Sequence, residues 1–156
     1  MNKFKKIGLG LVIMSLALVA AFSINKSSAD ASSKKKYSIK LYKGNDNANG
    51  FVTKTVKINN LTAYSIIKEL KAFGAVAPGV KANSLDYKGK YLTLDLSKEF
   101  AEDISSAGTS GEYVKVGAVV NTFIDAFNVD TLTITVEGKA WESGHVTYDR
   151  PLSKFQ

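Results

Sequence analysis

The sequence predicts an α+β fold, a two-layer sandwich in which a mixed or antiparallel sheet of about four principal strands carries two helices on one face. Two patterns predict this fold. Several short segments alternate apolar and polar residues, and two longer segments repeat apolar residues at the helical period. Strands that are buried on both faces would instead be apolar throughout. The helices are therefore expected to cover one side of the sheet only.

The first two strands are predicted at 37–43 and 51–58, on either side of the turn sequence GNDNANG at 44–50. Each segment alternates, so that one face is apolar and the other polar. The apolar faces carry Tyr37, Ile39 and Leu41 in the first strand and Val52, Val56 and Ile58 in the second. Both strands are expected to be half-buried.

The first helix is predicted to begin at Asn60 or Thr62, since either side chain suits an N-cap, and to end at Gly74. Its apolar residues recur at helical spacing and are Ala63, Ile66, Ile67, Leu70 and Phe73. A connection that contains Pro78 and Gly79 follows the helix.

Residues 84–97 are expected to form two strands joined at Gly89. Asp95 lies on the polar face of the second strand. Ser97 follows where the alternation ends, and Glu99 comes one or two residues into a helical turn. A serine N-cap and an acid near the positive end of the helix dipole account for both residues. The segment TLDLSKEF is thus predicted to be a strand, a cap and a first helical turn.

A Gly/Ser-rich loop at 105–111 precedes the strongest helical pattern in the chain. Its apolar stripe consists of Val116, Val119, Val120, Phe123, Ile124 and Phe127. A last strand is predicted at 131–137 and ends at Gly138. The tail at 139–155 is expected to be irregular, with one short edge strand at most.

The uncovered face of the predicted sheet is polar, flat and rich in threonine. Its residues are Thr53, Thr55, Thr93, Asp95, Thr131, Thr133 and Thr135. Such a face is either simply solvated, as in many antiparallel sheets, or a surface on which a partner docks. A stable interface buries about 800 Å² per partner, which an open four-stranded face can offer.

Residues 1–31 are predicted to be a signal peptide or an N-terminal signal anchor. The basic start MNKFKK precedes an apolar run from Ile7 to Ile24, and the triplet ADA that ends at Ala31 fits a cleavage signal of small residues. The apolar run is close to the length of about 20 residues that spans a membrane. Cleavage after Ala31 and retention as an anchor therefore both remain open.

A basic linker at 32–36 is expected to lead into a single domain at 37–156. Either fate of the first segment places this domain outside the cytoplasm, secreted or attached to the membrane only through Met1–Ile24. The chain has no Cys, so neither a lipidated cysteine nor a disulfide is expected.

The charge of the predicted domain is nearly balanced. Seven of the 21 basic residues and one of the 14 acidic residues lie before residue 37, which leaves 14 basic and 13 acidic residues, a net charge of +1. A protein that binds nucleic acid should carry a basic stripe on the domain itself. No nucleic acid is therefore expected among the partners.

Several segments resemble, in order, the GerMN domain of sporulation and spore-germination proteins. They are LYKG, TKTVKI, YLTLDLSKEF, VVNTFIDAFNVDTLTITVEGK and GHVTYDRPLS, and the resemblance covers 37–153. The most specific pieces are Asp95-Leu96-Ser97, Asn121-Thr122 and Val136-Glu137-Gly138-Lys139. The resemblance implies an extracytoplasmic domain similar to ring-building modules, which acts by binding or assembly without a cofactor. The chain departs from the sporulation-type protein in having one such domain and no lipidation cysteine.

Residues that could support catalysis or metal binding have simpler structural explanations. His145 has Asp149 nearby but lacks the sequence context of a catalytic serine. One His and no Cys disfavour zinc, and GNDNANG lacks the closing glutamate of an EF-hand loop, so neither a metal nor a cofactor is expected. Asp95 and Glu99 could act as a glycosidase pair only in a pocket, which their predicted positions do not imply.

The sequence thus favours a non-catalytic extracytoplasmic module of the bacterial cell envelope. The resemblance implies a link to sporulation or germination, and a general role in the envelope remains open beside it. The expected partners of the module are envelope or sporulation proteins, or further copies of the chain itself. The alternative is a module that binds cell-wall glycan through Trp141 and Tyr148. Packing of Trp141 in the core is the favoured interpretation of that residue, and a wall-associated hydrolase ranks last.

Overall fold

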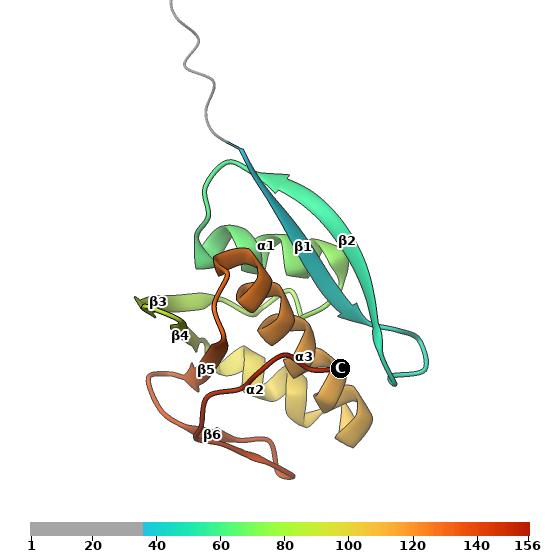
Figure 1. Cartoon of the computed structure of the whole chain (residues 1–156). Helices are drawn as coiled ribbons and strands as arrows, with labels where there is room; N and C mark the ends of the chain where they lie inside the picture. The colour runs from blue at the N-terminus through green and yellow to red at the C-terminus, as the bar shows by residue number, and fades with distance from the viewer. Residues whose placement is uncertain (1–35) are drawn as a thin grey trace, which may run out of the picture. The chain divides into compact units, whose positions relative to one another are not determined.

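The computed structural model describes residues 36–156, so the predicted signal segment at 1–31 and the linker residues 32–35 lie outside the described residues. The described part contains three helices and seven strands (Figure 1). In chain order they are β1 (Tyr37–Gly44), β2 (Phe51–Ile58), α1 (Ala63–Phe73), β3 (Ala82–Lys88), β4 (Tyr91–Leu96), α2 (Lys98–Ser105), α3 (Gly108–Phe127), β5 (Thr131–Val136), β6 (Trp141–Glu142) and β7 (Thr147–Tyr148). None of these helices combines the length and the apolar character needed to cross a membrane.

The strands form one mixed sheet and two separate hairpins. In the mixed sheet β4 lies between β3, which is antiparallel to it, and β5, which is parallel to it. β1 pairs with β2, and β6 pairs with β7, both antiparallel. The α+β class and the mixed sheet predicted from the sequence are confirmed. The principal strands are, however, divided between two sheets, and α2, for which the sequence predicts only the cap and a first turn, is a third full helix.

The hairpin β1–β2 is separate from the mixed sheet because β1 faces α3 (Figure 1). The backbone N–H of Tyr42 in β1 donates a buried hydrogen bond of 3.0 Å to Thr122 Oγ1 in α3. Buried backbone N–H groups need a partner, and here a helix side chain takes the place of a neighbouring strand. The alternating pattern of 37–58 therefore predicted a half-buried hairpin but could not identify its neighbour.

The helix α3 lies at the centre of the domain, where it contacts β1, β5, α1 and α2. Its buried residues are not confined to one stripe. They are Glu112, Val114, Val116, Gly117, Ala118, Val119, Val120, Asn121, Thr122, Phe123 and Ile124. A helix that is apolar around most of its circumference belongs in the interior, and the polar residues that it carries there need partners.

The helix α3 also begins earlier than predicted. It starts at Gly108, inside the segment 105–111 that the sequence predicts as a loop. Glycine and serine are poor helix formers, but tertiary packing routinely overrides such propensities. Here Glu112, in the first turns of the helix, is buried and accepts hydrogen bonds from Ser143 and Tyr148, and these contacts hold this part of the chain in place.

Both ends of α1 form as predicted. Thr62 is the N-cap residue, and its Oγ1 accepts a hydrogen bond of 3.2 Å from the N–H of Ser65. Gly74 ends the helix in the left-handed conformation, with φ of 74°, and its N–H bonds to the carbonyl of Lys71 at 2.9 Å. Glycine adopts this conformation without a steric penalty, which is why it stops the helix there.

Two glycines allow the hairpin to pack closely on α3. A Cβ atom added to Gly44 at the end of β1 would lie 2.5 Å from Val114 Cγ2. A Cβ atom added to Gly117 in α3 would lie 2.6 Å from Phe51 Cζ. The Phe51 ring in turn meets the ring of Tyr42 edge-on, with 6.1 Å between the ring centres. The close contact between β1–β2 and α3 thus depends on the absence of side chains at these positions.

Replacing Gly44 with alanine is expected to destabilise the domain. The added methyl group would overlap Val114, which is β-branched and fixed to α3, so that hairpin and helix would have to move apart. Overpacking of this kind costs about 1–3 kcal/mol. Urea denaturation of the full chain should show a lower midpoint with an unchanged slope.

The matched control is Gly50→Ala in the turn of the same hairpin. A Cβ atom at Gly50 would have Asn45 Nδ2 as its nearest contact, at 3.4 Å. This change should alter the free energy of unfolding by less than about 0.5 kcal/mol. Equal midpoints for Gly44→Ala and the unchanged chain would contradict the close approach of β1 to α3.

Candidate functional site

The open face of the mixed sheet brings together five of the seven residues predicted to form a binding face. The register of β4 and β5 pairs Tyr91 with Thr131, Thr93 with Thr133 and Asp95 with Thr135. On β3, the residues Ser84, Asp86 and Lys88 pair with the same side of β4. The opposite side of these strands is buried in the core and carries Leu92, Leu94, Leu96, Leu132 and Ile134. The three strands therefore have a polar face on one side of the sheet and an apolar face on the opposite side.

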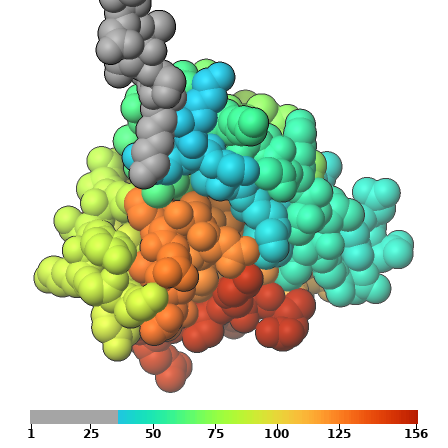
Figure 2. Space-filling view, turned by 45° about the horizontal axis from the view of Figure 1, so that its top comes forward, coloured from blue at the N-terminus to red at the C-terminus, as the bar shows by residue number. Residues whose placement is uncertain are grey.

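Thr53 and Thr55 are not part of this face. Both are exposed on β2, which pairs only with β1 within the described residues. On the surface, β2 and the β3–β4 hairpin lie on opposite sides, with the end of α3 and the start of β5 between them (Figure 2). This corrects the prediction that a single face carries all seven residues. Alternation shows which side of a strand is polar, but it does not show to which sheet the strand belongs.

Asp95 holds the ends of β4 and β5 together. Its Oδ1 accepts hydrogen bonds from Thr135 Oγ1 at 2.6 Å and from the N–H of Gly138 at 2.7 Å, and its Oδ2 accepts one from Asn83 Nδ2 at 3.0 Å. Burial by itself would raise the pKa of Asp95, but these hydrogen bonds outweigh it and lower the pKa. The carboxylate is therefore held in its ionised form and connects β3, β4 and the end of β5.

Glu137 completes this junction from the turn after β5. Its Oε1 accepts a hydrogen bond of 3.0 Å from the N–H of Lys98, the first residue of α2. Ser97 is the N-cap residue of α2, as predicted, but its Oγ accepts a hydrogen bond from the N–H of Lys81 at 3.0 Å instead of one from the helix. A carboxylate from a distant turn thus occupies the positive end of α2. The sequence predicts that Ser97 itself satisfies the first N–H groups of α2. The contact with Glu137 cannot be predicted from local sequence, because Glu137 lies far along the chain.

Asn121 and Thr122 fix two further segments to α3. Asn121 Oδ1 accepts a hydrogen bond from the N–H of Phe155 at 2.8 Å, and its Nδ2 donates to the carbonyl of Phe155 at 3.1 Å. Thr122 binds β1 through Tyr42, as described above. The three pieces that carry the resemblance to the GerMN domain therefore each connect segments that are far apart in the chain.

A buried polar cluster around Glu112 is missing from the sequence predictions. Glu112 is only 3% exposed, and its Oε1 accepts hydrogen bonds from Ser143 Oγ at 2.5 Å and from the Tyr148 hydroxyl at 2.6 Å. Burial, together with the hydrogen bond to Glu112 and its charge, raises the pKa of Tyr148. The cluster fixes the β6–β7 hairpin to the start of α3. A single glutamate in a Gly/Ser-rich segment is typical of a loop. The sequence therefore did not indicate that Glu112 would be buried and would bind the β6–β7 hairpin.

Trp141 and Tyr148, the residues of the glycan-binding alternative, are buried, with 7% and 6% exposure. Their rings stack on each other with 4.4 Å between centres, and Phe100 packs edge-on against the indole at 5.4 Å. A sugar that stacks on an aromatic residue needs an exposed ring face. The geometry therefore fits the favoured prediction that Trp141 packs in the core.

The other residues that could support chemistry are not assembled into a reactive site. His145 lies between β6 and β7, where its backbone N–H donates to Ser143 Oγ at 3.2 Å. The segment 44–50 forms the turn between β1 and β2 and is closed by hydrogen bonds between Asn45 and Asn49. Within the described residues there is no group of three or more His, Cys, Asp or Glu that could hold a metal ion.

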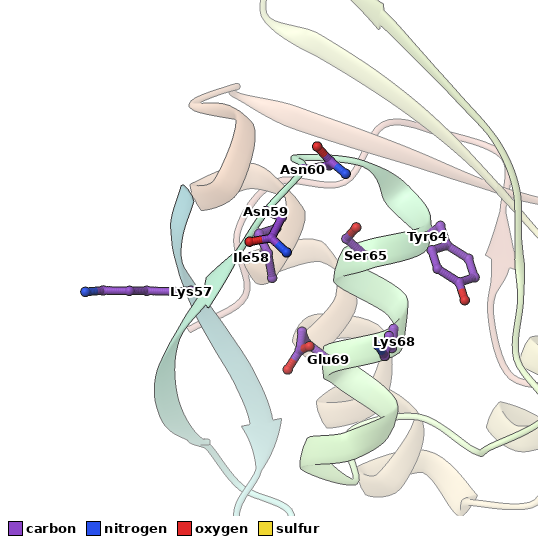
Figure 3. A pocket seen from close by; sticks show the side chains of 8 residues that line it. All are labelled: Lys57, Ile58, Asn59, Asn60, Tyr64, Ser65, Lys68 and Glu69. Carbon is purple, nitrogen blue, oxygen red and sulfur yellow. The ribbon is translucent and has the colours of Figure 1, made fainter. Parts of the chain in front are cut away.

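Shallow pockets surround α1. One of about 210 Å³ lies between the end of β2 and the first turns of the helix, where Ser65 and Glu69 are on the side that faces β2 (Figure 3). Two others lie between α1 and β3. Tyr64 lines all three pockets and is 74% exposed. The helix α1 is thus flanked by hollows on two sides, and Tyr64 stands between them.

Replacing Asp95 with asparagine is expected to destabilise the domain in a pH-dependent way. Hydrogen bonds to a charged group contribute about 1.5–3 kcal/mol, and the variant should lose about this much at neutral pH. Because the folded state lowers the pKa of Asp95, its contribution is present above the usual aspartate pKa of about 3.9 and is lost as the pH falls through the lowered pKa. Urea denaturation of both proteins over a pH series measures this difference.

Asp86→Asn is the control, because Asp86 is an exposed carboxylate on the same face of β3. It should change the free energy of unfolding by less than about 0.5 kcal/mol. A loss for Asp95→Asn that stays the same from neutral pH to strongly acidic pH would contradict the role of the ionised carboxylate.

Two solved structures align with the chain, and the first of them has a similar fold. The tandem GerMN domains of the sporulation protein GerM from Bacillus subtilis align with a TM-score of 0.54 and 18% identity, over 84% of this chain and 49% of that one. A 2.5 Å crystal structure from Clostridium perfringens, described provisionally as a lipoprotein, aligns with a TM-score of 0.47 and 15% identity, over 77% of this chain and 87% of that one. At such low identity the likeness concerns the fold alone. No curated protein matches the chain.

A family model described as "Germane: Sporulation and spore germination" matches residues 40–142. The match extends from β1 to β6 and includes Asp95, Thr122 and Glu137, which hold the chain segments together. Together with the similarity to the tandem GerMN domains, it confirms the resemblance found in the sequence. The chain belongs to the Germane family of sporulation and spore germination proteins.

Proposed function

We propose that this chain is a non-catalytic binding module of the bacterial cell envelope, and that it docks a protein partner on the open face of β3, β4 and β5. One observation carries the proposal. The side of these strands that bears Leu94 and Ile134 is buried in the core, whereas the side that bears Tyr91 and Thr93 is exposed. A sheet face that the domain leaves uncovered is available to another molecule.

The composition of the open face suits a protein partner. Thr93 and Thr133 are direct neighbours across β4 and β5, and their short hydroxyl side chains keep the surface flat and able to form hydrogen bonds. Tyr91, which is 61% exposed, adds an amphipathic ring at one end of this face. Tyrosine is enriched among the residues that dominate protein interfaces, because it combines apolar area with a polar group.

The absence of turnover is proposed from the way in which the carboxylates are used. Asp95 and Glu137 accept hydrogen bonds from the backbone of other segments, and Glu112 accepts them from two buried hydroxyl groups. A general acid or base needs access to a substrate proton. These three groups instead connect parts of the chain to one another.

The cellular setting of the proposal comes from the family and from the N-terminal segment. The family is described by sporulation and spore germination. The apolar run from Ile7 to Ile24, which lies outside the described residues, is typical of an exported chain. Envelope or sporulation proteins outside the cytoplasm are therefore the proposed partners. Binding of wall glycan by Trp141 and Tyr148 has no comparable support, because both rings are buried.

Changing both Thr93 and Thr133 to lysine tests the proposal. The two charges would lie side by side in the middle of the proposed interface. An uncompensated charge in an interface is strongly unfavourable, so recovery of the partner should fall at least about tenfold, which corresponds to about 1.4 kcal/mol. The measurement is affinity purification of the tagged full chain from detergent-solubilised envelope of the native cell, with quantitative mass spectrometry of the proteins that co-purify.

The control changes Thr53 and Thr55 to lysine. These threonines are also exposed, but they lie on β2, in the β1–β2 hairpin and outside the mixed sheet. Their change should leave recovery of the partner unaltered. The proposal fails if the same protein is recovered equally with both double variants, or if the unchanged chain recovers wall glycan instead of a protein.

A further inference from the structure

A groove runs between α1 and β3. One cavity of about 390 Å³ is lined by residues 61–64, at the start of α1, and by residues 82–85, at the start of β3. A second cavity of about 210 Å³ shares Tyr64 and Ala82 with the first and is lined in addition by Ile67, Lys68, Lys71 and Lys81. These two cavities together are called the α1–β3 groove below.

The groove follows the free edge of a strand. Four consecutive residues of β3 line it, and successive side chains of a strand point to opposite faces. The register shifts between Ala82 and Ser84, but Ser84 pairs with Asp95 of the open face and Leu85 pairs with Leu94 of the buried face. A groove lined by both Ser84 and Leu85 therefore lies along the edge of the strand. Within the described residues β3 pairs only with β4, so this edge has no neighbouring strand. An unpaired edge presents backbone N–H and C=O groups that can bind another extended segment.

The charged residues that line the groove are all positive: Lys68, Lys71 and Lys81 line its second cavity, and no Asp or Glu lines either cavity. Residues 36–85 contain eight lysines and two acidic residues, a net charge of +6, whereas residues 86–156 contain seven basic and eleven acidic residues, a net charge of −4. The small net charge of residues 36–156 is therefore the sum of a positive part and a negative part. Of the eight lysines, only Lys40 has a carboxylate within 4 Å in the described part of the chain. Lys68 and Lys81 at the groove are exposed.

The floor of the groove is less polar than its rim. Leu61, Ala82 and Leu85 are partly buried there, and the exposed ring of Tyr64 stands at the side. A phosphate polymer would use the lysines but neither this floor nor the strand edge. An extended peptide would use all three, since alternate side chains can enter the groove while the backbone pairs with β3.

We propose that the α1–β3 groove binds an extended acidic segment of a partner protein. The segment adds as a strand to the free edge of β3, places apolar side chains over Leu61 and Leu85, and sets its carboxylates against Lys68 and Lys81. The proposal rests on the proposed function as a binding module, and it adds a second contact surface with a stated partner chemistry. Because the edge of β3 borders the open face, one partner can occupy both.

Selection from a random displayed peptide library against the full chain, held in mild detergent, tests the chemistry of the partner. The selected peptides should be enriched in Asp and Glu and should contain apolar residues at alternate positions. Amide hydrogen exchange with a selected peptide should become slower in β3, because a strand that pairs with the free edge protects its outward N–H groups. Slower exchange confined to β2 or to the open face, or selected peptides without acidic residues, would overturn the proposal.

Two charge-reversal variants separate the groove from general attraction. Lys68→Glu combined with Lys81→Glu should weaken binding of the selected peptides at least about tenfold, because both charges pair directly with the bound carboxylates. Lys54→Glu combined with Lys57→Glu makes the same change of net charge on β2, where both side chains are exposed and neither lines the groove. This variant should weaken binding less than about threefold, because salt screens exposed charges that make no direct contact with the peptide. Equal weakening by both variants would mean attraction to the positive surface alone and would refute a site in the groove.

The same variants distinguish this inference from the proposed function. Recovery of the native partner that depends on Thr93 and Thr133 but not on Lys68 and Lys81 would leave the proposed function intact and reject the groove. If the selected peptides bind the groove but recovery of every native partner is independent of Thr93 and Thr133, the inference about the groove stands and docking on the open face is rejected. Selected peptides that match acidic segments of this chain would assign the groove to a second copy, and would thereby overturn the partner proposed here.

Discussion

The burial of α3 is the constraint on which the rest of the structure depends. A helix surrounded by other elements cannot leave polar groups without partners, because an unsatisfied buried polar group is strongly unfavourable. Three segments supply these partners: the β6–β7 hairpin binds Glu112, β1 binds Thr122, and the C-terminal tail binds Asn121. The polar residues of α3 therefore determine which segments pack around it, while its apolar residues form part of the common core.

The sequence predicted the elements of the fold better than their neighbours. Periodicity and caps located α1 between Thr62 and Gly74, as well as most of the strands, because these features depend on residues close together in the chain. The alternation in β2 resembles that in β4, yet Thr55 and Thr93 lie on different sheets. The difference arises from α3, which packs against β1 and binds Tyr42 through Thr122 and Asp125. No local pattern contains that information.

The candidate binding face was predictable in part for the same reason. Residues of β4 and β5 were assigned to one polar face, and the parallel register confirms their proximity. The groove beside β3 was not foreseen, because it depends on the packing of α1 against a strand edge. The pieces that identify the family, such as Asp95 and Glu137, turn out to hold the chain together. They consequently indicate how a member of this family folds more directly than what it binds.

The attachment of both ends of the domain to its middle has a consequence for the order of folding. β1 and Phe155 each bind α3, which lies between them in the chain, and β4 pairs with β5 only after two helices have intervened. Contacts between distant segments require the closure of long loops and form slowly. The tail segment around Phe155 covers Asn121, so the polar interior of α3 stays incomplete until that segment has packed against the helix. Completion of the domain therefore depends on contacts between segments that are far apart in the chain.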